Sequence, residues 1–203
     1  MRSGASHFQF NRMNLRTIAQ PTVQLGREID QILEAEEHYG QITFVSAFVA
    51  LRTILRLRDR LLVQFQAGCR LRLTVGVDLG GTSSEVLEEL LRWNCEVFVF
   101  HNPIPRATFH PKLYLFESAA EATLIVGSNN LTDGGFYTNY EASVRYDFDL
   151  PTDAVLYRQI ADPLRPFIEP EGPTVQRLTA ELISTLVPTS TSAKSRNVEK
   201  RAS

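Results

Sequence analysis

The middle of the chain alternates between short apolar segments and longer amphipathic ones. Residues 41–48 (QITFVSAF), 70–77 (RLRLTVGV) and 95–100 (CEVFVF) are rich in β-branched and aromatic side chains, which is typical of strands. Residues 51–65 and 80–93 lie between them and repeat apolar side chains at helical spacing. Because strands that are connected through helices share one sheet, this order predicts an α/β domain whose parallel or mixed sheet is covered by helices.

The pattern changes after residue 108. Three strands are predicted there, at residues 112–117 (KLYLFE), 123–128 (TLIVGS) and 141–147 (EASVRYD). A loop at residues 131–139 joins the last two. Its glycines, Gly134 and Gly135, are expected to supply unusual backbone angles.

A chain of 203 residues has room for one domain with a proper core. We divide it into an N-terminal arm (1–20), one folded domain (21–170) and a C-terminal helix with a flexible basic tail (171–203). Outer helices are expected at residues 23–39, 153–168 and 173–187.

Polar side chains gather around the strands of the second half. His110 and Lys112 are two positions apart at the start of one strand, so they project to the same face, while Glu117 projects to the other. The same alternation pairs Ser128 with Asn130 at the end of the next strand. These residues form one compact group in the sequence.

This group has the chemistry of a metal-free phosphodiesterase. A neutral imidazole (His110) can attack phosphorus, and an ammonium (Lys112) can neutralise a non-bridging oxygen. The Ser128 hydroxyl and the Asn130 amide can donate further hydrogen bonds to the phosphoryl group. Glu141 can accept from the second imidazole nitrogen and fix its tautomer, as the acid does in a Ser-His-Asp triad. No metal-ligand cluster accompanies these residues, so neither a metal nor a cofactor is expected.

The composition also singles out Lys112. Only three of the 21 Lys and Arg residues are lysines, and the other two lie in the last ten residues. In a chain that otherwise uses arginine, a single lysine indicates a site that needs a compact point charge. The alternative is that an arginine-rich chain kept one lysine by chance.

The motif HxKxxxxE, followed by GSNN and NYE, resembles the HKD signature of the phospholipase D superfamily. The spacing from His110 to Glu141 is similar to that of its prokaryotic nucleases, in particular the metal-independent restriction endonucleases. A weaker likeness extends back to about residue 41. The family's usual aspartate is Glu117 here. Its position on the opposite face predicts a structural hydrogen bond rather than a catalytic task.

The resemblance implies a phospholipase D-like fold, with a mixed sheet between helices, and a two-histidine mechanism. Because the chain carries one motif, it implies a homodimer in which one His110 forms a phosphohistidine and its symmetry mate acts as general acid. It further implies a DNA endonuclease of restriction or defence type. Such enzymes carry a DNA-recognition domain, so either cleavage is sequence-tolerant, or recognition comes from a separate recognition or defence-system partner or from a further C-terminal portion.

Two other functions stay open: a phospholipid-directed phosphodiesterase and a catalytically idle nucleic-acid-binding module. The net charge of −2 divides into −5 for residues 1–193 and +3 for the tail, so nucleic acid would need a local basic patch. Arg52, Arg56 and Arg60 recur on one helical face and either supply that patch or form a solvated stripe.

Three residues near the motif are further candidates. Arg106 could contact a phosphate, Thr132 could assist substrate binding, and His101 could line the cleft or belong to an ordinary connection. Asp133 is expected to form a turn rather than act as an acid.

The remaining features predict the compartment. The N-terminal residues lack the apolar run of a signal peptide and no segment is apolar enough to cross a membrane, so a cytoplasmic protein without membrane contact is expected. Cys69 and Cys95 show no metal-ligand spacing and are expected as buried, reduced thiols.

Overall fold

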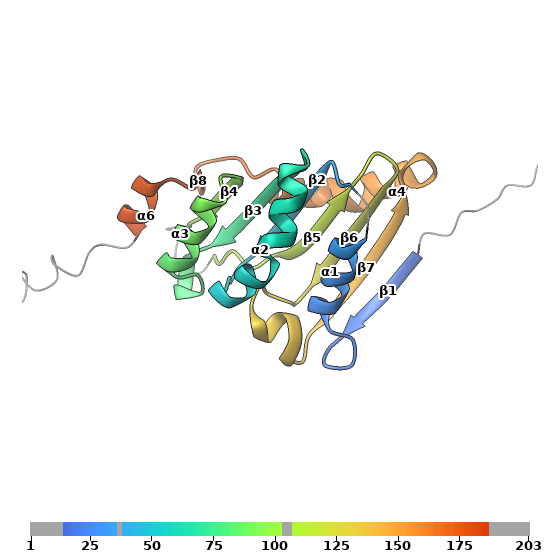
Figure 1. The fold of residues 1–203 in the computed structure, drawn as a ribbon, viewed down its shortest axis with the longest axis horizontal. Helices are drawn as coiled ribbons and strands as arrows, with labels where there is room; N and C mark the ends of the chain where they lie inside the picture. Colours follow the sequence, from blue (N-terminus) through green and yellow to red (C-terminus); the bar gives the residue numbers. More distant parts are fainter. Residues whose placement is uncertain (1–13, 36–37, 103–106, 187–203) are drawn as a thin grey trace, which may run out of the picture.

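The computed structural model describes residues 14–35, 38–102 and 107–186, which form a mixed sheet with helices on both faces (Figure 1). The described residues contribute eight strands in the order β1-β7-β6-β5-β2-β3-β4-β8. The strands are β1 (Asn14–Ala19), β2 (Gln41–Ser46), β3 (Arg70–Gly76), β4 (Glu96–Phe100), β5 (Lys112–Glu117), β6 (Glu121–Gly127), β7 (Ala142–Asp149) and β8 (Val175–Arg177). The predicted α/β class with a mixed sheet is confirmed.

The strands joined by helices are the parallel ones. β2 pairs in parallel with β3, and β3 with β4, whereas the other pairings are antiparallel. β5 runs against β2 with Lys112 opposite Ser46, so the start of β5 lies beside the end of β2. We call this border, formed by the carboxyl ends of β2, β3 and β4 and the start of β5, the carboxyl edge of the sheet.

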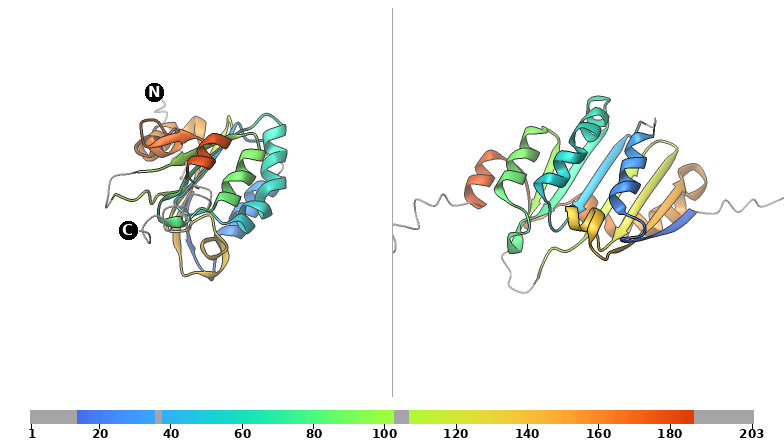
Figure 2. Two further views of the ribbon diagram at one scale, coloured as in Figure 1. Left: turned by 90° about the vertical axis from the view of Figure 1, so that its left-hand side faces the viewer. Right: turned by 60° about the horizontal axis from the view of Figure 1, so that its bottom comes forward.

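The helices form two layers (Figure 2). One face carries α1 (Leu25–Glu34), α2 (Leu51–Gln66) and α3 (Ser84–Arg92), with α6 (Ala180–Leu186) packed against α3. The other face carries α4 (Leu150–Ala161) and α5 (Arg165–Ile168). The helices predicted at residues 51–65 and 80–93 correspond to α2 and α3, and the one predicted at 23–39 corresponds to the shorter α1. The helix predicted at 153–168 is divided into α4 and α5 by a turn at Asp162–Leu164.

Side chains of β5 alternate between the two cores. Tyr114 and Phe116 belong to the core beneath α1, α2 and α3, whereas Leu113 and Leu115 belong to the core on the α4 face. Lys112 is two positions before Tyr114 and therefore projects to the same face, whereas Glu117 is two positions after Leu115 and projects to the other face. The predicted separation of Lys112 and Glu117 onto opposite faces therefore follows from the register.

The two outermost strands were not predicted. Residues 14–19, placed in the N-terminal arm by the sequence, form β1 at one edge of the sheet, and only Ile18 of this strand is buried. Residues 173–187 were predicted as helix, but 175–177 pair with β4 and the helix begins only at Ala180. Edge strands bury one side at most, so neither segment carries the strong apolar signal of an inner strand.

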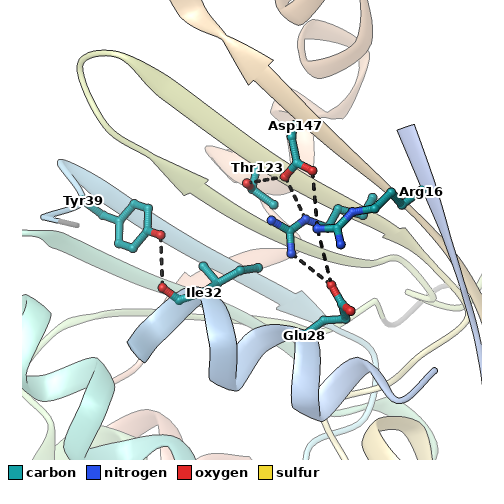
Figure 3. Close-up of polar contacts among 7 residues, drawn as sticks. Arg16, Glu28, Ile32, Tyr39, Thr123 and Asp147 are labelled. Carbon is teal, nitrogen blue, oxygen red and sulfur yellow. Dashed lines mark hydrogen bonds and ion pairs between the residues drawn. The ribbon is translucent and has the colours of Figure 1, made fainter. Parts of the chain in front are cut away.

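Ion pairs attach β1 and β7 to α1 (Figure 3). Arg145 Nη1 lies 3.0 Å from Glu28 Oε2, and its Nε lies 2.7 Å from Asp147 Oδ1. Arg16 of β1 approaches the same two carboxylates at 3.7 and 3.6 Å. Thr123 donates to Asp147 at 2.8 Å. The charges balance within this cluster, so it is a structural tie between helix and sheet.

Arg145→Ala is expected to lower the free energy of unfolding by about 1 to 3 kcal/mol, because it leaves two mostly buried carboxylates without their main donor. The matched control is Arg16→Ala. The Arg16 side chain is 46% exposed, so its loss should cost less than about 1 kcal/mol. Urea unfolding followed by circular dichroism measures both values. Equal losses would show that the Arg145 contacts are no stronger than the exposed ones.

Candidate active site

His110 and Lys112 lie at the carboxyl edge, where the chain enters β5. His110 is exposed, whereas Lys112 is only 4% exposed. Lys112 Nζ lies 2.6 Å from His110 Nδ1 and donates to the His110 carbonyl oxygen at 2.7 Å. The predicted pairing of the two side chains on one face is thus observed, with a direct contact between them.

Burial also changes the acidity of Lys112. Removal of the ammonium from water lowers the pKa of Lys112 below its usual value, and attraction to the Glu141 carboxylate opposes this shift. Lys112 is therefore a cation with little competing hydration. Such a group interacts strongly with a nearby anion.

The segment after β2 forms the next wall of the site. The Phe48 ring stands edge-on to the His110 ring, with centroids 6.3 Å apart. The Phe48 backbone N–H donates to Asn130 Oδ1 at 3.2 Å, and the Leu131 backbone N–H donates to Ser46 Oγ at 2.9 Å. These bonds connect the end of β2 to the GSNN segment, so Asn130 is held close to the same edge as His110.

Glu141 is engaged by other residues than His110. Its carboxylate accepts from the Ser128 hydroxyl and, at 3.2 Å, from Asn139 Nδ2. Within the described part of the chain no hydrogen bond joins Glu141 to His110, and Lys112 occupies Nδ1 of the imidazole instead. The sequence therefore predicted Glu141 near the site but not its contact, since the position of the acid depends on how the loop returns to β7.

Ser128 and Thr132 also have partners inside the protein. The Ser128 hydroxyl donates to Glu141 and accepts from the Ala142 backbone N–H at 3.1 Å. Thr132 Oγ accepts from the Gly135 backbone N–H at 3.0 Å. Both hydroxyls therefore stabilise the loop that carries the site, and their contact with substrate stays a prediction. Arg106 lies outside the described residues.

The two loop glycines have another role than the one predicted. Neither has a positive φ; the described glycines with positive φ are Gly68, Gly80 and Gly172. A Cβ on Gly135 would lie 2.2 Å from the Asn130 carbonyl oxygen, so close packing against the GSNN segment explains this glycine. The sequence does not distinguish the two reasons, because both favour glycine.

A buried amide network, which was not predicted from the sequence, holds the loop. Asn129 is fully buried and its Nδ2 donates to Gln20 Oε1 at 3.1 Å and to the Gly135 carbonyl at 2.6 Å. Gln20 also donates to the Asn139 carbonyl at 3.1 Å and accepts from the Leu25 backbone N–H at 3.1 Å. The available signal was the alternation itself, which turns Asn129 inward when Ser128 and Asn130 face the site.

Glu117 makes the structural hydrogen bond that was predicted for it. Its carboxylate accepts from the Tyr157 hydroxyl of α4, on the face away from Lys112. Burial, together with this carboxylate, raises the pKa of Tyr157 above the usual range. The glutamate at the family's aspartate position therefore ties β5 to α4.

The arginines of α2 are not equivalent. Arg60 pairs with Asp30 at 2.8 Å and with Glu34 at 3.3 Å. The Arg52 side chain is 78% exposed and lies 3.6 Å from Asp133, and the Arg56 guanidinium stands over the Tyr137 ring. Arg52 and Arg56 thus border the 131–139 loop, whereas Arg60 serves a structural contact. Asp133 also accepts from Thr53 at 3.3 Å, in keeping with its predicted structural role.

Other features of the chain bear on metals, thiols and membranes. The described residues contain no group of three or more His, Cys, Asp or Glu side chains that could hold a metal ion, and none of their helices is long and apolar enough to cross a membrane. Cys69 and Cys95 are buried and free, as predicted. Burial raises the pKa of Cys69 to about 11 and that of Cys95 to about 12.

An exposed imidazole, a buried ammonium and an amide thus lie together at one edge of an α/β sheet. A family model described as "Cardiolipin synthase, PLD-like domain" matches residues 28–154, which is more than half of the chain. The chain therefore belongs to the phospholipase D-like family, a family of phosphodiester-cleaving enzymes, and the predicted family is confirmed. Comparison with curated protein sequences gave no significant match.

Solved structures share the fold at low sequence identity. The phospholipase D family member Nuc from Salmonella typhimurium is 14% identical with a TM-score of 0.57, over 82% of this chain and 98% of Nuc. NucT from Helicobacter pylori is 12% identical with a TM-score of 0.54, over 78% of this chain and 97% of NucT. Phosphatidylserine synthase from Haemophilus influenzae is 12% identical with a TM-score of 0.57, over 94% of this chain and 48% of the synthase. The predicted phospholipase D-like fold is confirmed.

Proposed function

We propose that the protein is a metal-independent DNA endonuclease of a restriction or defence system, which acts as a homodimer through a phosphohistidine intermediate. The observation that carries this proposal is the exposed His110 in contact with the buried Lys112 at the carboxyl edge. The pair supplies a nucleophile and a cation for the phosphoryl oxygens without a metal.

Formation of the intermediate requires a change in the His110–Lys112 contact. An ammonium that donates to Nδ1 leaves the imidazole proton on Nε2, whereas attack through Nε2 needs that proton on Nδ1. A bound phosphodiester draws the Lys112 ammonium onto its non-bridging oxygen and thereby frees Nδ1 to hold the proton. Asn130 Oδ1 is occupied by the Phe48 N–H, so its NH₂ group is the donor available to the second oxygen.

Nucleophile and general acid then act in turn. Nε2 of one His110 forms a bond to phosphorus as the P–O bond to the leaving group breaks, and the partner's His110 gives its proton to the leaving oxygen. The neutral imidazole of that partner next takes a proton from water. The resulting hydroxide displaces Nε2 from phosphorus, which restores both histidines.

The need for a second chain is supported by the position of His101. Lys112, Ser46, Val75 and Val99 form one row across β5, β2, β3 and β4. His101 follows this row at one end as His110 precedes it at the other. Three strand intervals correspond to about 14 Å between the two backbones, and the His101 ring is held by Asp78 and not by the residues around His110.

Nucleic acid is the substrate that the surroundings of the site favour. Arg52 and Arg56 border the 131–139 loop and offer cations beside it. The fold is also shared with Nuc and NucT. A phospholipid-directed phosphodiesterase is the alternative, because phosphatidylserine synthase has a similar fold.

A nuclease assay in EDTA tests the proposal, with DNA, RNA and phosphatidylcholine vesicles as substrates. We expect cleavage of DNA that continues in the chelator, and no lipid product. Activity that disappears in EDTA and returns with magnesium or manganese would contradict the mechanism. Cleavage of the lipid alone would establish the alternative, and DNA binding without cleavage would indicate an idle module.

The lowered pKa of Lys112 leads to a prediction about pH. The ammonium is needed in its charged form, and burial lowers its pKa below the usual lysine pKa of about 10.4. As the pH rises, kcat/KM should therefore begin to fall before the pH reaches that usual pKa. In Lys112→Arg the guanidinium stays charged, so this decline should vanish, although the misfit of the planar fork should lower the rate at neutral pH at least about tenfold. An identical alkaline decline in both enzymes would assign it to another group.

A further inference from the structure

His101 and Asp78 form a second oriented polar pair at the carboxyl edge. His101 Nδ1 lies 2.7 Å from Asp78 Oδ1, and Asp78 Oδ2 accepts from the Asn102 backbone N–H at 3.1 Å. The Asp78 side chain is 18% exposed, while that of His101 is 48% exposed. The carboxylate is thus fixed through both oxygens, and it fixes the orientation of a ring that solvent can reach.

Two hollows are lined in part by His101. One hollow of about 530 Å³ is lined by His101, Asp78 and Thr82, and a second of about 600 Å³ is lined by His101 and Arg177. The contact with Asp78 uses Nδ1 of His101 and leaves Nε2 for a ligand, and the buried Thr82 hydroxyl in the first hollow has no hydrogen-bond partner among the described residues. The His101 ring is therefore the part of the pair that a ligand can contact.

The position of the pair relates it to the catalytic site. His101 and His110 extend from the same edge of the sheet and at the same level, about 14 Å apart by strand spacing. Gly81, beside Thr82, packs against Phe48, which in turn contacts His110. A polymer that runs along the edge from His110 would thus reach His101 within a few nucleotides, since one strand of a duplex advances about 3.4 Å per nucleotide.

We propose that His101, oriented by Asp78, binds a backbone phosphate of the nucleic acid a few nucleotides from the scissile bond. The inference rests on the proposed function and deepens it. The carboxylate of Asp78 holds Nδ1 and so leaves Nε2 to face a ligand, and a phosphate oxygen is a strong acceptor for an imidazole N–H. A contact of this kind positions the strand without reading its bases. Asp78 acts through His101 and is a positioning residue.

Binding of a fluorescent single-stranded DNA tests this, in a His110→Asn background that prevents cleavage. We expect His101→Ala to weaken binding about five- to tenfold, and to reduce the slope of log K against log salt by about 0.7, the value for one lost single-strand phosphate contact. His101→Gln, which keeps a donor, should lose less. The matched control is His38→Ala, because His38 is exposed but precedes β2 at the opposite edge of the sheet.

A double-mutant cycle tests the role of Asp78. Asp78→Asn should weaken binding less than His101→Ala, and the double variant should bind no more weakly than His101→Ala alone, because Asp78 acts only through the ring. Additive losses would remove Asp78 from the proposal. An unchanged dissociation constant and salt slope in His101→Ala would overturn it, as would an altered oligomeric state, which would assign His101 to a subunit interface.

Kinetics in the enzyme with intact His110 separate this inference from the proposed function. Loss of His101 should raise KM severalfold while kcat stays within about twofold, since the contact is remote from the reacting phosphorus. If the protein cleaves DNA but His101→Ala leaves KM and binding unchanged, the inference alone fails. If it binds DNA through His101 without cleaving it, the proposed nuclease activity fails and the phosphate contact stands.

Discussion

His110→Ala is expected to reduce DNA cleavage by at least about 10⁴-fold, because the substitution removes the atom that forms the bond to phosphorus. The histidine is exposed and precedes β5, so its loss leaves no buried cavity. The fold should therefore survive. Single-turnover cleavage assays, with urea unfolding as a check on stability, measure the two effects separately.

The control for this variant is His38→Ala. His38 is an exposed histidine that lies outside the carboxyl edge, and its replacement should leave the cleavage rate unchanged. If His110→Ala kept a rate within about tenfold of the wild type, His110 could not be the nucleophile. The phosphohistidine would then have to be abandoned with it.

Mixing subunits should produce the second large effect. When wild-type chains exchange with a ninefold excess of His110→Ala chains, about nine in ten of the wild-type chains enter heterodimers that hold a single His110. Because the mechanism needs one His110 for attack and one for proton transfer, the activity per wild-type chain should fall about tenfold. Cleavage rates before and after confirmed exchange give the comparison.

The opposite result is equally definite. Activity that stayed proportional to the number of wild-type chains would mean that each subunit works alone. The general acid would then have to come from the same chain, in which about 14 Å separates the strands next to His101 and His110. His101→Ala would be the first variant to assay for kcat in that case.

Strand parity alone is sufficient to place several side chains. Lys112 and Glu117 lie on opposite faces, and Glu117 makes the structural bond to Tyr157 that parity predicted. The alternation has a period of two, so an odd sequence separation within one strand is enough to assign opposite faces. The same argument would have turned Asn129 inward, where it connects the loop to Gln20.

Contacts across the loop could not be obtained in this way. Glu141 was expected behind His110, but its carboxylate meets Ser128 and Asn139, while Lys112 contacts the imidazole. Ser128 meets Glu141 because β6 pairs with β7, with Gly127 opposite Ser143, and Asn139 is only two positions before Glu141. Loop geometry depends on many weak contacts between distant residues, and no local pattern encodes it.

The sequence by itself determined the class of the fold, the inner strands and helices, and the group of residues around His110. Apolar periodicity and motif spacing are local, so they survive without knowledge of the tertiary structure. Only the tertiary structure decided that residues 14–19 and 175–177 close the two edges of the sheet, that Gly135 is needed for close packing, and that His101 is held by Asp78. Each of these depends on segments that are distant in the chain, and their pairing is set by the packing of the whole sheet and not by the residues of either segment alone.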